Sequence, residues 1–336
     1  MSLHGLRPFG FQNPWLVLAC PEFADIAKEM VETAPRGTMD LGSIQWKVFP
    51  DGTPNLKFDA QVIEGRDVIF LGSVRENFLP FFSICYAIPR CLARTFTVIC
   101  PFFPTGTMER VEKEGEVATA KTLARMMSAT PSPQVGDTNF AFFDMHALAT
   151  RFYFADSIKA HLLTAVPLLQ HHLAFVTNHD GSKPVIAFPD EGAKKRFGGM
   201  FKDHYEIAYC MKTRRGNRRE VVLQEGNIKG KKVFIIDDLV QSGGTLIECK
   251  DLMYTMGATS VNAYVTHGVF PRESWRKFLP ENTPKGKRPF DEFVLTDSIP
   301  STSRAVKGKA PFRVLSIGDQ LVSMLASPKL LSPSKL

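Results

Sequence analysis

Two adjacent carboxylates, Asp237 and Asp238, follow the apolar run Val233–Ile236 and carry the strongest chemical signal in the sequence. The turn after them is small and rich in hydroxyl and glycine residues: Gln241, Ser242, Gly243, Gly244 and Thr245. Such a turn, opening a helix, can surround a phosphate with backbone N–H groups and hydroxyls. Because carboxylates repel phosphate, we expect the two aspartates to bind ribose hydroxyls. The alternative is a plain strand exit with an acidic turn, which the full strand–carboxylate–turn–helix pattern disfavours.

Four further segments carry charged or polar residues that could act with this turn. Asp190, Glu191 and Gly192 follow the apolar run Val185–Phe188 and precede Lys194, Lys195 and Arg196. Alone, that segment predicts a solvated turn and a basic helix face. His146 lies in the segment DMHA, which follows the apolar run Phe140–Asp144. Taken singly, such a histidine is more often structural than functional.

The other two segments are a basic run and a turn. Lys212 and Arg214 stand in the run CMKTRRGNRRE, whose cations could stabilise the negative charge of an anionic ligand. An exposed basic loop is the alternative. Phe49 and Asp51 belong to FPDG, for which a binding role and a simple Pro-Asp-Gly turn are equally good interpretations.

Short apolar runs alternate with helix-like stretches and predict an α/β fold with parallel strands covered on both faces. We expect strands at Trp15–Cys20, Asp67–Leu71, Phe96–Cys100, Phe140–Asp144, Val185–Phe188, Val233–Ile236 and Val261–Thr266. We expect helices at Val117–Ser128, Ser157–Ala174, Thr245–Met256 and Ile317–Ala326. In open α/β sheets ligands bind beyond the carboxyl ends of strands. The polar residues after three of these strands therefore predict one assembled site.

Length, composition and charge exclude or disfavour several classes of protein. A chain of 336 residues, 44% hydrophobic, predicts about two domains. No apolar run is long enough for a membrane span. The six cysteines form no CxxC pair, which disfavours zinc and a disulfide framework. The net charge of +7 suits anionic metabolites. The basic clusters carry no interleaved aromatic residues, so nucleic-acid binding is not favoured.

Taken together and in order, the segments resemble the ribose-phosphate diphosphokinases, also called PRPP synthetases. DDLVQSGGT is similar to the PRPP-binding loop that these enzymes share with type I phosphoribosyltransferases, and FPDEG is similar to their pyrophosphate loop. The resemblance is strongest to the plant-type, class II enzymes, through PFFPTGTMER, RFYFAD, DDLVQSGGTLIEC and AYVTHGVFP. It covers roughly residues 49–312.

The resemblance implies transfer of the diphosphoryl group of ATP to ribose 5-phosphate, with Mg2+ as cofactor. Its implied roles are these: catalysis by Lys212 and Arg214; ATP binding by Phe49, Asp51 and His146; ribose 5-phosphate and PRPP binding by Asp237, Asp238 and Gln241 to Thr245; pyrophosphate binding by Asp190, Glu191 and Gly192; and metal binding by His146 and Asp190. The class II resemblance also implies activity without a phosphate requirement. A homo-oligomer is expected.

The family fold consists of two similar α/β domains of the phosphoribosyltransferase type I fold, each with a mostly parallel sheet flanked by helices. It implies an N-terminal domain at residues 1–160, completed by a helix at 312–330, and a C-terminal domain at 161–311 with the PRPP loop. The tail, 331–336, ends in Ser334-Lys335-Leu336, a peroxisomal import tripeptide. We therefore expect an import receptor as partner and a peroxisome or glycosome-like location, with the cytoplasm as the alternative.

Departures from the family pattern leave two rival functions open. Gln241 stands where the loop usually has an acid, which weakens assignment as a type I phosphoribosyltransferase, because Gln cannot serve as a base. Thr53 stands where the family usually has an acidic residue, and Thr107 and Met108 replace an Arg–Gln pair that contacts ATP in other PRPP synthetases. These departures leave room for a non-catalytic regulatory subunit. The presence of His146 and of the basic and acidic segments described above favours the enzyme.

Overall fold

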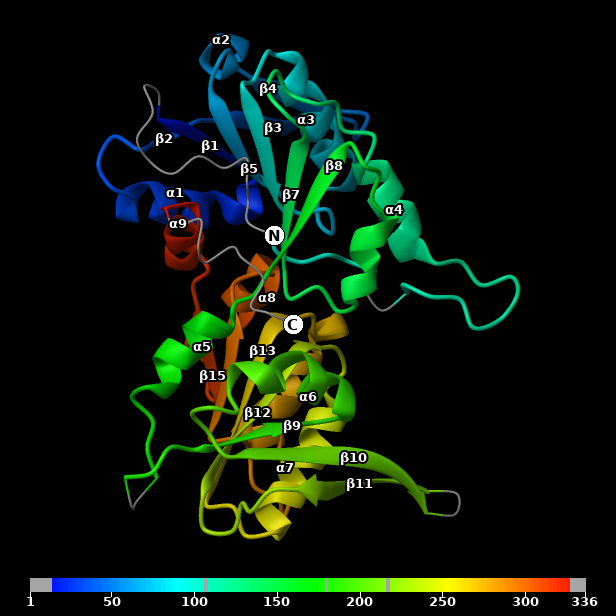
Figure 1. The fold of residues 1–336 in the computed structure, drawn as a ribbon, viewed down its shortest axis with the longest axis vertical. Helices are drawn as coiled ribbons and strands as arrows, with labels where there is room; N and C mark the ends of the chain where they lie inside the picture. The colour runs from blue at the N-terminus through cyan, green and yellow to red at the C-terminus, as the bar shows by residue number, and fades with distance from the viewer. Residues whose placement is uncertain (1–13, 106–107, 179–180, 216–217, 327–336) are drawn as a thin grey trace. The chain divides into compact units, whose positions relative to one another are not determined.

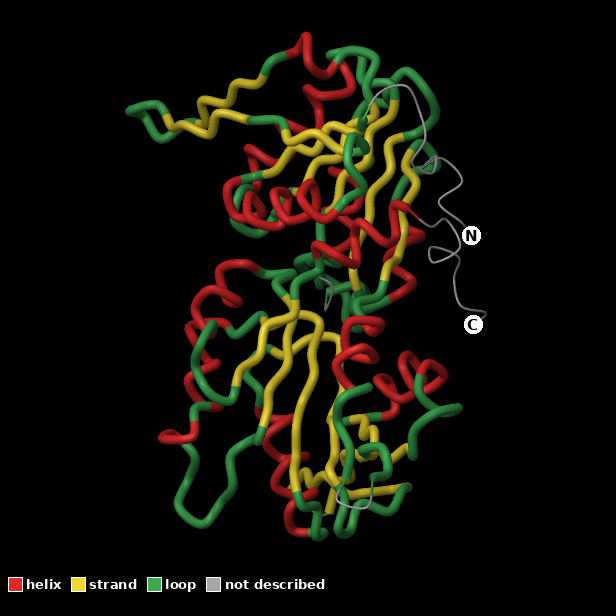
Figure 2. The backbone as a smooth tube through the Cα atoms, turned by 90° about the vertical axis from the view of Figure 1, so that its left-hand side faces the viewer, coloured by secondary structure: helices red, strands yellow, loops and turns green. Residues whose placement is uncertain are grey.

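The chain forms two compact units, comprising residues 1–164 with 316–336 and residues 165–315 (Figure 1). The computed structural model describes residues 14–105, 108–178, 181–215 and 218–326. Both units are α/β, with helices on either side of a central sheet (Figure 2). From the sequence, we expected the chain to pass from the first unit to the second between residues 160 and 161 and to return between 311 and 312. In the structure these two boundaries lie between residues 164 and 165 and between 315 and 316.

The first unit is built on a six-stranded sheet of order β2-β1-β5-β6-β7-β8, in which every neighbouring pair is parallel. Its strands are β1 (Trp15–Ala19), β2 (Met39–Leu41), β5 (Asp67–Leu71), β6 (Thr95–Ile99), β7 (Thr138–Phe143) and β8 (Ile158–Leu163). A separate antiparallel hairpin pairs β3 (Ile44–Val48) with β4 (Pro54–Phe58). Every residue of β5 and β7 is buried, as expected for a sheet covered on both faces.

The helices of the first unit supply the apolar faces that bury its sheet. They are η1 (Pro21–Phe23), α1 (Ala24–Thr33), α2 (Ala60–Ile63), α3 (Phe78–Arg90), α4 (Thr119–Met127), η2 (Leu148–Tyr153) and α9 (Gly318–Ala326). Helix α9 packs on α1, although most of the chain separates them in sequence. The Ser316 hydroxyl donates to the Glu29 carboxylate at 2.7 Å, and the Gln320 amide donates to the Thr164 carbonyl. Helix α9 thus completes the first unit.

The second unit is built on a seven-stranded sheet of order β11-β10-β9-β12-β13-β14-β15. Its strands are β9 (Val185–Phe188), β10 (Ile207–Arg215), β11 (Arg218–Glu225), β12 (Lys232–Val240), β13 (Ser260–Gly268), β14 (Glu292–Thr296) and β15 (Phe312–Leu315). All neighbours are parallel except the hairpin of β10 and β11. The helices are α5 (Val166–Leu173), α6 (Glu191–Phe197), η3 (Gly198–Met200), α7 (Gly244–Thr255), η4 (Pro271–Phe278), η5 (Pro280–Asn282) and α8 (Pro300–Val306). The expected pair of mostly parallel α/β domains is confirmed.

Two expected elements were wrong in type or length. The helix expected at Ser157–Ala174 is instead strand β8 followed by α5, because Ile158–Leu163 pairs with β7 as a parallel edge strand. Pro167 stands in the first turn of α5, where a missing N–H costs nothing, so the helix begins there. The strand expected to end at Ile236 continues to Val240, because β13 runs beside it up to Gly268.

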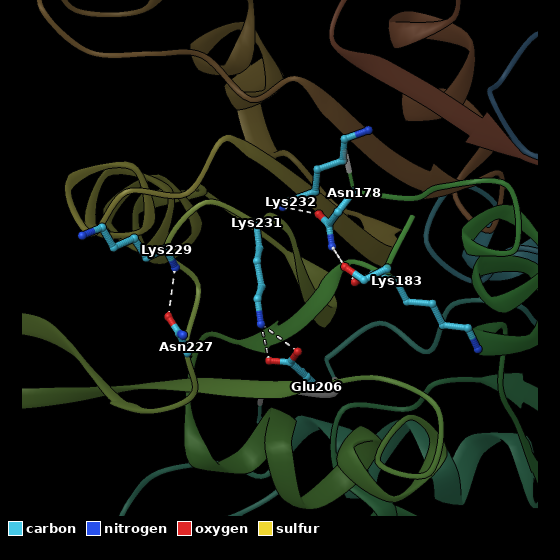
Figure 3. A network of polar contacts seen from close by, with 8 residues as sticks. Asn178, Lys183, Glu206, Asn227, Lys229, Lys231 and Lys232 are labelled. Atoms are coloured by element: carbon cyan, nitrogen blue, oxygen red, sulfur yellow. Dashed lines mark hydrogen bonds and ion pairs between the residues drawn. The ribbon is translucent and has the colours of Figure 1, made fainter. Parts of the chain in front are cut away.

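A polar network fixes the amino-terminal edge of the second sheet (Figure 3). The Asn178 side chain accepts from the Lys232 backbone N–H at 2.7 Å and donates to the Lys183 carbonyl at 2.7 Å. The Lys231 ammonium donates to both carboxylate oxygens of Glu206 at 2.7 Å. These contacts lie at the starts of β9, β10 and β12 and therefore set the register in which those strands reach their carboxyl ends.

The described ranges contain no helix long and apolar enough to cross a membrane. All six cysteines carry free thiols, and five of them are buried.

Burial of His161 on β8 predicts a pH-dependent stability of the first unit. Burial lowers the pKa of His161 to about 4, assisted by the positive charges of Lys159 and Arg151. The folded state thus disfavours the protonated ring. The free energy of unfolding should fall as the pH drops below about 6.5 and level off near pH 4. The total loss should approach about 3 kcal/mol.

Chemical denaturation across this range measures the effect. In His161→Gln the slope between pH 6.5 and 4 should shrink, whereas the matched control His171→Gln, at an exposed position, should retain it. An equal slope in both variants would contradict the prediction.

Candidate active site

Three carboxylates meet at the carboxyl ends of neighbouring strands in the second unit. Asp190 lies two residues after the end of β9, and Asp237 and Asp238 lie near the end of β12. Strand β12 pairs in parallel with β9, with Phe234 opposite Ile186 and Ile235 opposite Ala187. The sheet therefore brings together the two turns that the sequence singled out separately. Asp238 is 4% exposed, and Asp237 is partly buried.

Burial and crowding of negative charge together set the electrostatics of this edge. Burial raises the pKa of Asp237 well above its usual range, and the charge of Asp238, a hydrogen bond shared between the two carboxyl groups and the charge of Asp190 raise it further. A ligand that donates hydrogen bonds or brings a cation relieves this repulsion. Sugar hydroxyls and a metal ion are both ligands of that kind.

A basic residue that the sequence left without a role offsets part of this charge. The Arg196 guanidinium on α6 lies 3.3 Å from the Asp238 carboxylate, and both side chains are largely buried. Asp190 caps the same helix by accepting from the Ala193 N–H at 2.9 Å. Helix α6 thus fixes one carboxylate at its start and supplies a cation to another. The contact with Asp238 is not local in sequence, so it becomes visible only in the fold, which turns Arg196 inward.

The turn Gln241–Thr245 connects β12 to α7. Gly243 adopts φ +81° and α7 begins at the next residue. A Cβ at Gly243 would lie 2.3 Å from Cζ of Phe278. Among the described residues, the backbone N–H groups of Ser242, Gly243 and Gly244 form no hydrogen bond. Three donors beside a helix N-terminus are suited to an anion, as the sequence predicted.

The remaining predicted residues of the second unit lie on α6 and on the β10/β11 hairpin. Glu191 is exposed, and the Lys195 ammonium 2.8 Å away lowers its pKa. Gly192 is exposed in the same turn. The sequence placed Lys212 and Arg214 in a loop, but the structure places them in strand β10, with Lys212 opposite Val221 and Arg214 opposite Arg219 in β11.

The predicted ATP-binding residues belong to the first unit. Phe49 and Asp51 lie in the turn between β3 and β4, which is closed by the Phe49 N–H donating to the Thr53 carbonyl at 2.8 Å. The hydroxyl and N–H of Thr53 both donate to the Asp51 carboxylate and lower its pKa. Thr53, a departure from the family pattern, thus fixes Asp51 in the turn. His146 is exposed beyond the end of β7.

The carboxylate oxygens of this edge could coordinate a metal ion, but they do not form a complete coordination sphere. Within the described ranges, no three His, Cys, Asp or Glu side chains converge to hold a metal. Mg2+ commonly uses one or two carboxylates, water and substrate phosphates instead. One oxygen of Asp190 accepts from Ala193, which leaves the other oxygen for a ligand. The carboxylates of this edge therefore fit a Mg2+ ion that arrives with a phosphorylated substrate.

Two predictions fall outside the described residues. Thr107 is one, and the tripeptide Ser334-Lys335-Leu336 is the other. The peroxisomal or glycosome-like location and the receptor that the tripeptide implies stay predictions.

Comparison with known proteins tests the family resemblance. Residues 16–130 match the model for the N-terminal domain of ribose phosphate pyrophosphokinase, and residues 195–285 match the phosphoribosyl transferase domain. The chain is 44% identical to ribose-phosphate pyrophosphokinase 4 of Arabidopsis thaliana over 91% of this chain and 90% of that protein. It is 44% identical to the chloroplastic ribose-phosphate pyrophosphokinase 3 of Oryza sativa over 92% of this chain and 75% of that protein.

This chain belongs to the ribose-phosphate pyrophosphokinase family. The fold agrees: phosphoribosylpyrophosphate synthetase from Mycobacterium smegmatis superposes with a TM-score of 0.75 at 22% identity, covering 93% of this chain and 98% of that one. The resemblance to plant ribose-phosphate pyrophosphokinases is thereby confirmed.

The two glycines of the turn Gln241–Thr245, called the phosphate turn below after its predicted ligand, differ in the space around an added Cβ, which gives a test of the turn's geometry. Gly243→Ala places a methyl group in a left-handed conformation against the Phe278 ring, and should lower the free energy of unfolding by about 1–3 kcal/mol. Gly244→Ala is the matched control, because nothing lies within 4 Å of its added methyl group.

Thermal and chemical denaturation of both variants measures the difference. Gly244→Ala should stay within about 0.5 kcal/mol of the unchanged chain. Equal stability of the two variants would contradict the geometry described here.

Proposed function

We propose that this chain transfers the β,γ-diphosphoryl group of ATP to the C1 hydroxyl of ribose 5-phosphate, giving PRPP and AMP. The observation that carries the proposal is a turn with unpaired backbone N–H groups beside buried and partly buried carboxylates at one sheet edge, in a member of the ribose-phosphate pyrophosphokinase family. A phosphate and a polyhydroxylated sugar are the two halves of ribose 5-phosphate. The product would feed nucleotide synthesis.

Ribose 5-phosphate fits this edge in one orientation. Its phosphate accepts hydrogen bonds from the N–H groups of Ser242, Gly243 and Gly244 and from the hydroxyls of Ser242 and Thr245. Its ring hydroxyls donate to Asp237 and Asp238, which offsets the repulsion between those carboxylates. The turn at Asp190 to Gly192 then adjoins the position where the diphosphoryl group is attached.

The chemistry is an in-line displacement at phosphorus. The C1 oxygen loses its proton to solvent and bonds to the β-phosphorus, and the bond from the β-phosphorus to the oxygen of the α-phosphate breaks, releasing AMP. Lys212 and Arg214 stabilise the negative charge of the group in transfer. Phe49, Asp51 and His146 bind ATP. A bound Mg2+ would neutralise charge on the phosphates. No covalent intermediate is needed.

The supporting experiment incubates the purified chain with Mg2+, ATP and ribose 5-phosphate, without added inorganic phosphate, and follows AMP and PRPP by chromatography. Equal amounts of both products are expected. Activity only after phosphate is added would retain the enzyme but remove the class II assignment. No product under either condition, from a folded chain that binds ribose 5-phosphate, would favour a regulatory subunit. Light scattering on the same sample measures the expected homo-oligomer.

The basic residues of β10 give a sharper test of mechanism. The double variant Lys212→Ala/Arg214→Ala should lose about 10²-fold or more in kcat, because it removes charge needed chiefly in the transition state. Its affinity for ribose 5-phosphate should change little. Lys229→Ala is the charge control, because this exposed lysine lies at the opposite edge of the same sheet (Figure 3). A double variant with unchanged kcat would refute the assigned roles.

A further inference from the structure

The segment η4 contacts three successive residues of the phosphate turn, from 30 or more positions away in sequence. The Ser274 hydroxyl donates to the Gln241 carbonyl at 2.9 Å. The Lys277 ammonium donates to the Ser242 carbonyl at 3.5 Å. The Phe278 ring fills the space beside Gly243 that a Cβ would need. All of these residues belong to the second unit.

The segment η4 is anchored by packing of its buried aromatic side chains. Phe278 packs against Phe293 with ring centroids 4.8 Å apart and against Phe270 at 5.4 Å and Phe290 at 5.8 Å. Trp275 and Phe278 are almost completely buried, whereas Lys277 is exposed. The contacts with the turn are therefore made by a segment whose position is fixed by an aromatic cluster.

The backbone around the start of this segment is strained. Phe270, Arg272 and Glu273 have φ values of 39°, 52° and 57°, a region that residues with side chains rarely adopt. Such conformations persist only where the surrounding structure imposes them, and they cluster at functional sites. Here the strained run presents Ser274 and Lys277 to the phosphate turn.

Peptide geometry links those two contacts to anion binding. The peptide bonds after Gln241 and Ser242 are trans, so each carbonyl points away from the N–H of the next residue. With the carbonyls of Gln241 and Ser242 turned toward η4, the N–H groups of Ser242 and Gly243 face the opposite side. These are two of the three backbone donors of the turn that bond to no described residue.

We propose that Ser274 and Lys277 are positioning residues for phosphate recognition: they fix two carbonyls of the turn so that the following N–H groups converge on the 5-phosphate of ribose 5-phosphate. The inference rests on the proposed function. The cation of Lys277 also polarises the peptide in the favourable direction, because a positive charge at the carbonyl end strengthens the N–H as a donor to an anion. The turn Gln241–Thr245 has no Lys or Arg of its own.

The test compares three single variants and one double variant of the full chain. Ser274→Ala and Lys277→Met each remove one contact and keep most of the side-chain bulk. Each should raise the KM and Kd for ribose 5-phosphate about fivefold, and the double variant more than tenfold. The kcat and the KM for ATP should change less than twofold. Arg276→Met is the matched control, because this neighbouring cation pairs with Glu273 and stacks on Trp275 instead of contacting the turn.

A rescue variant separates positioning from general stability. Ser274→Thr keeps the hydroxyl and should restore affinity, although it changes the side chain as much as Ser274→Ala does. Lys277 is exposed, so Lys277→Met should fold with an unchanged melting temperature. Ribose 5-phosphate affinities of Ser274→Ala and Lys277→Met equal to that of the unchanged chain would overturn the inference. A loss in Arg276→Met as large as in Lys277→Met would also overturn it, because net charge alone would then explain the effect.

A second probe keeps this test distinct from the test of the proposed function. Inorganic phosphate binding, followed by competition or by 31P NMR, needs no catalysis. If the unchanged chain binds phosphate and Lys277→Met binds it several-fold more weakly, the positioning role holds even when no PRPP is formed. If the unchanged chain makes PRPP but neither variant loses phosphate or ribose 5-phosphate affinity, only the positioning role fails. If the unchanged chain binds neither ligand, both proposals fail.

Discussion

Parallel pairing of β12 with β9 on one side and β13 on the other is the constraint on which the site depends. Parallel strands end at the same edge, so residues that follow them in sequence become neighbours in space. This pairing places Asp190 near Asp237 across 47 positions of sequence. The polar network at the starts of the same strands, around Asn178, fixes their register at the other edge. The geometry of the site is thus set by ordinary sheet pairing before any ligand contributes.

The charges at this edge determine which ligands it favours. Three carboxylates share a partly buried space, and burial together with the charges of Asp238 and Asp190 raises the pKa of Asp237. Arg196 and the cap at α6 offset part of that cost. The negative charge that remains favours ligand groups that donate hydrogen bonds or carry positive charge. Immediately beside it, the turn before α7 presents N–H groups and favours an anion. A sugar phosphate satisfies both requirements with one molecule.

Sequence patterns predicted the parts of this arrangement that are local. The apolar runs of β5 and β9 gave their exact bounds, and the turn at Gln241–Thr245 was recognised because its glycines and hydroxyls are contiguous. Gly257 follows the helix expected at Thr245–Met256, and its φ of +91° is the left-handed conformation in which glycine commonly ends a helix. Strand β8 was obscured by the apolar run of α5, which merged with it into one apparent helix. Pairing with β7, which no local pattern reports, decided between them.

Non-local contacts account for what sequence reasoning missed at the site. Arg196 and Lys195 are adjacent and equally basic, yet only the packing of α6 on β12 turns Arg196 toward Asp238. Ser274 and Phe278 carry no chemical signature, and their importance follows from their contact with a turn more than 30 residues earlier. Such residues are found only when the fold shows what they touch.

The few residues at and after the ends of β5 in the first unit and β12 in the second decide whether polar groups remain available to a ligand. Strand order in the first unit, β2-β1-β5-β6-β7-β8, parallels β10-β9-β12-β13-β14-β15 in the second, so β5 occupies the place of β12. After β5, however, the chain reads GSVREN, without paired carboxylates or the Ser-Gly-Gly-Thr turn. There the Ser73 hydroxyl bonds to Glu76, and the Asn77 amide donates to Glu22 at 2.6 Å. Polar groups at the end of β5 thus satisfy one another, whereas those at the end of β12 leave N–H groups directed outward. The same sheet supports both outcomes, and the turn residues decide which one a unit adopts.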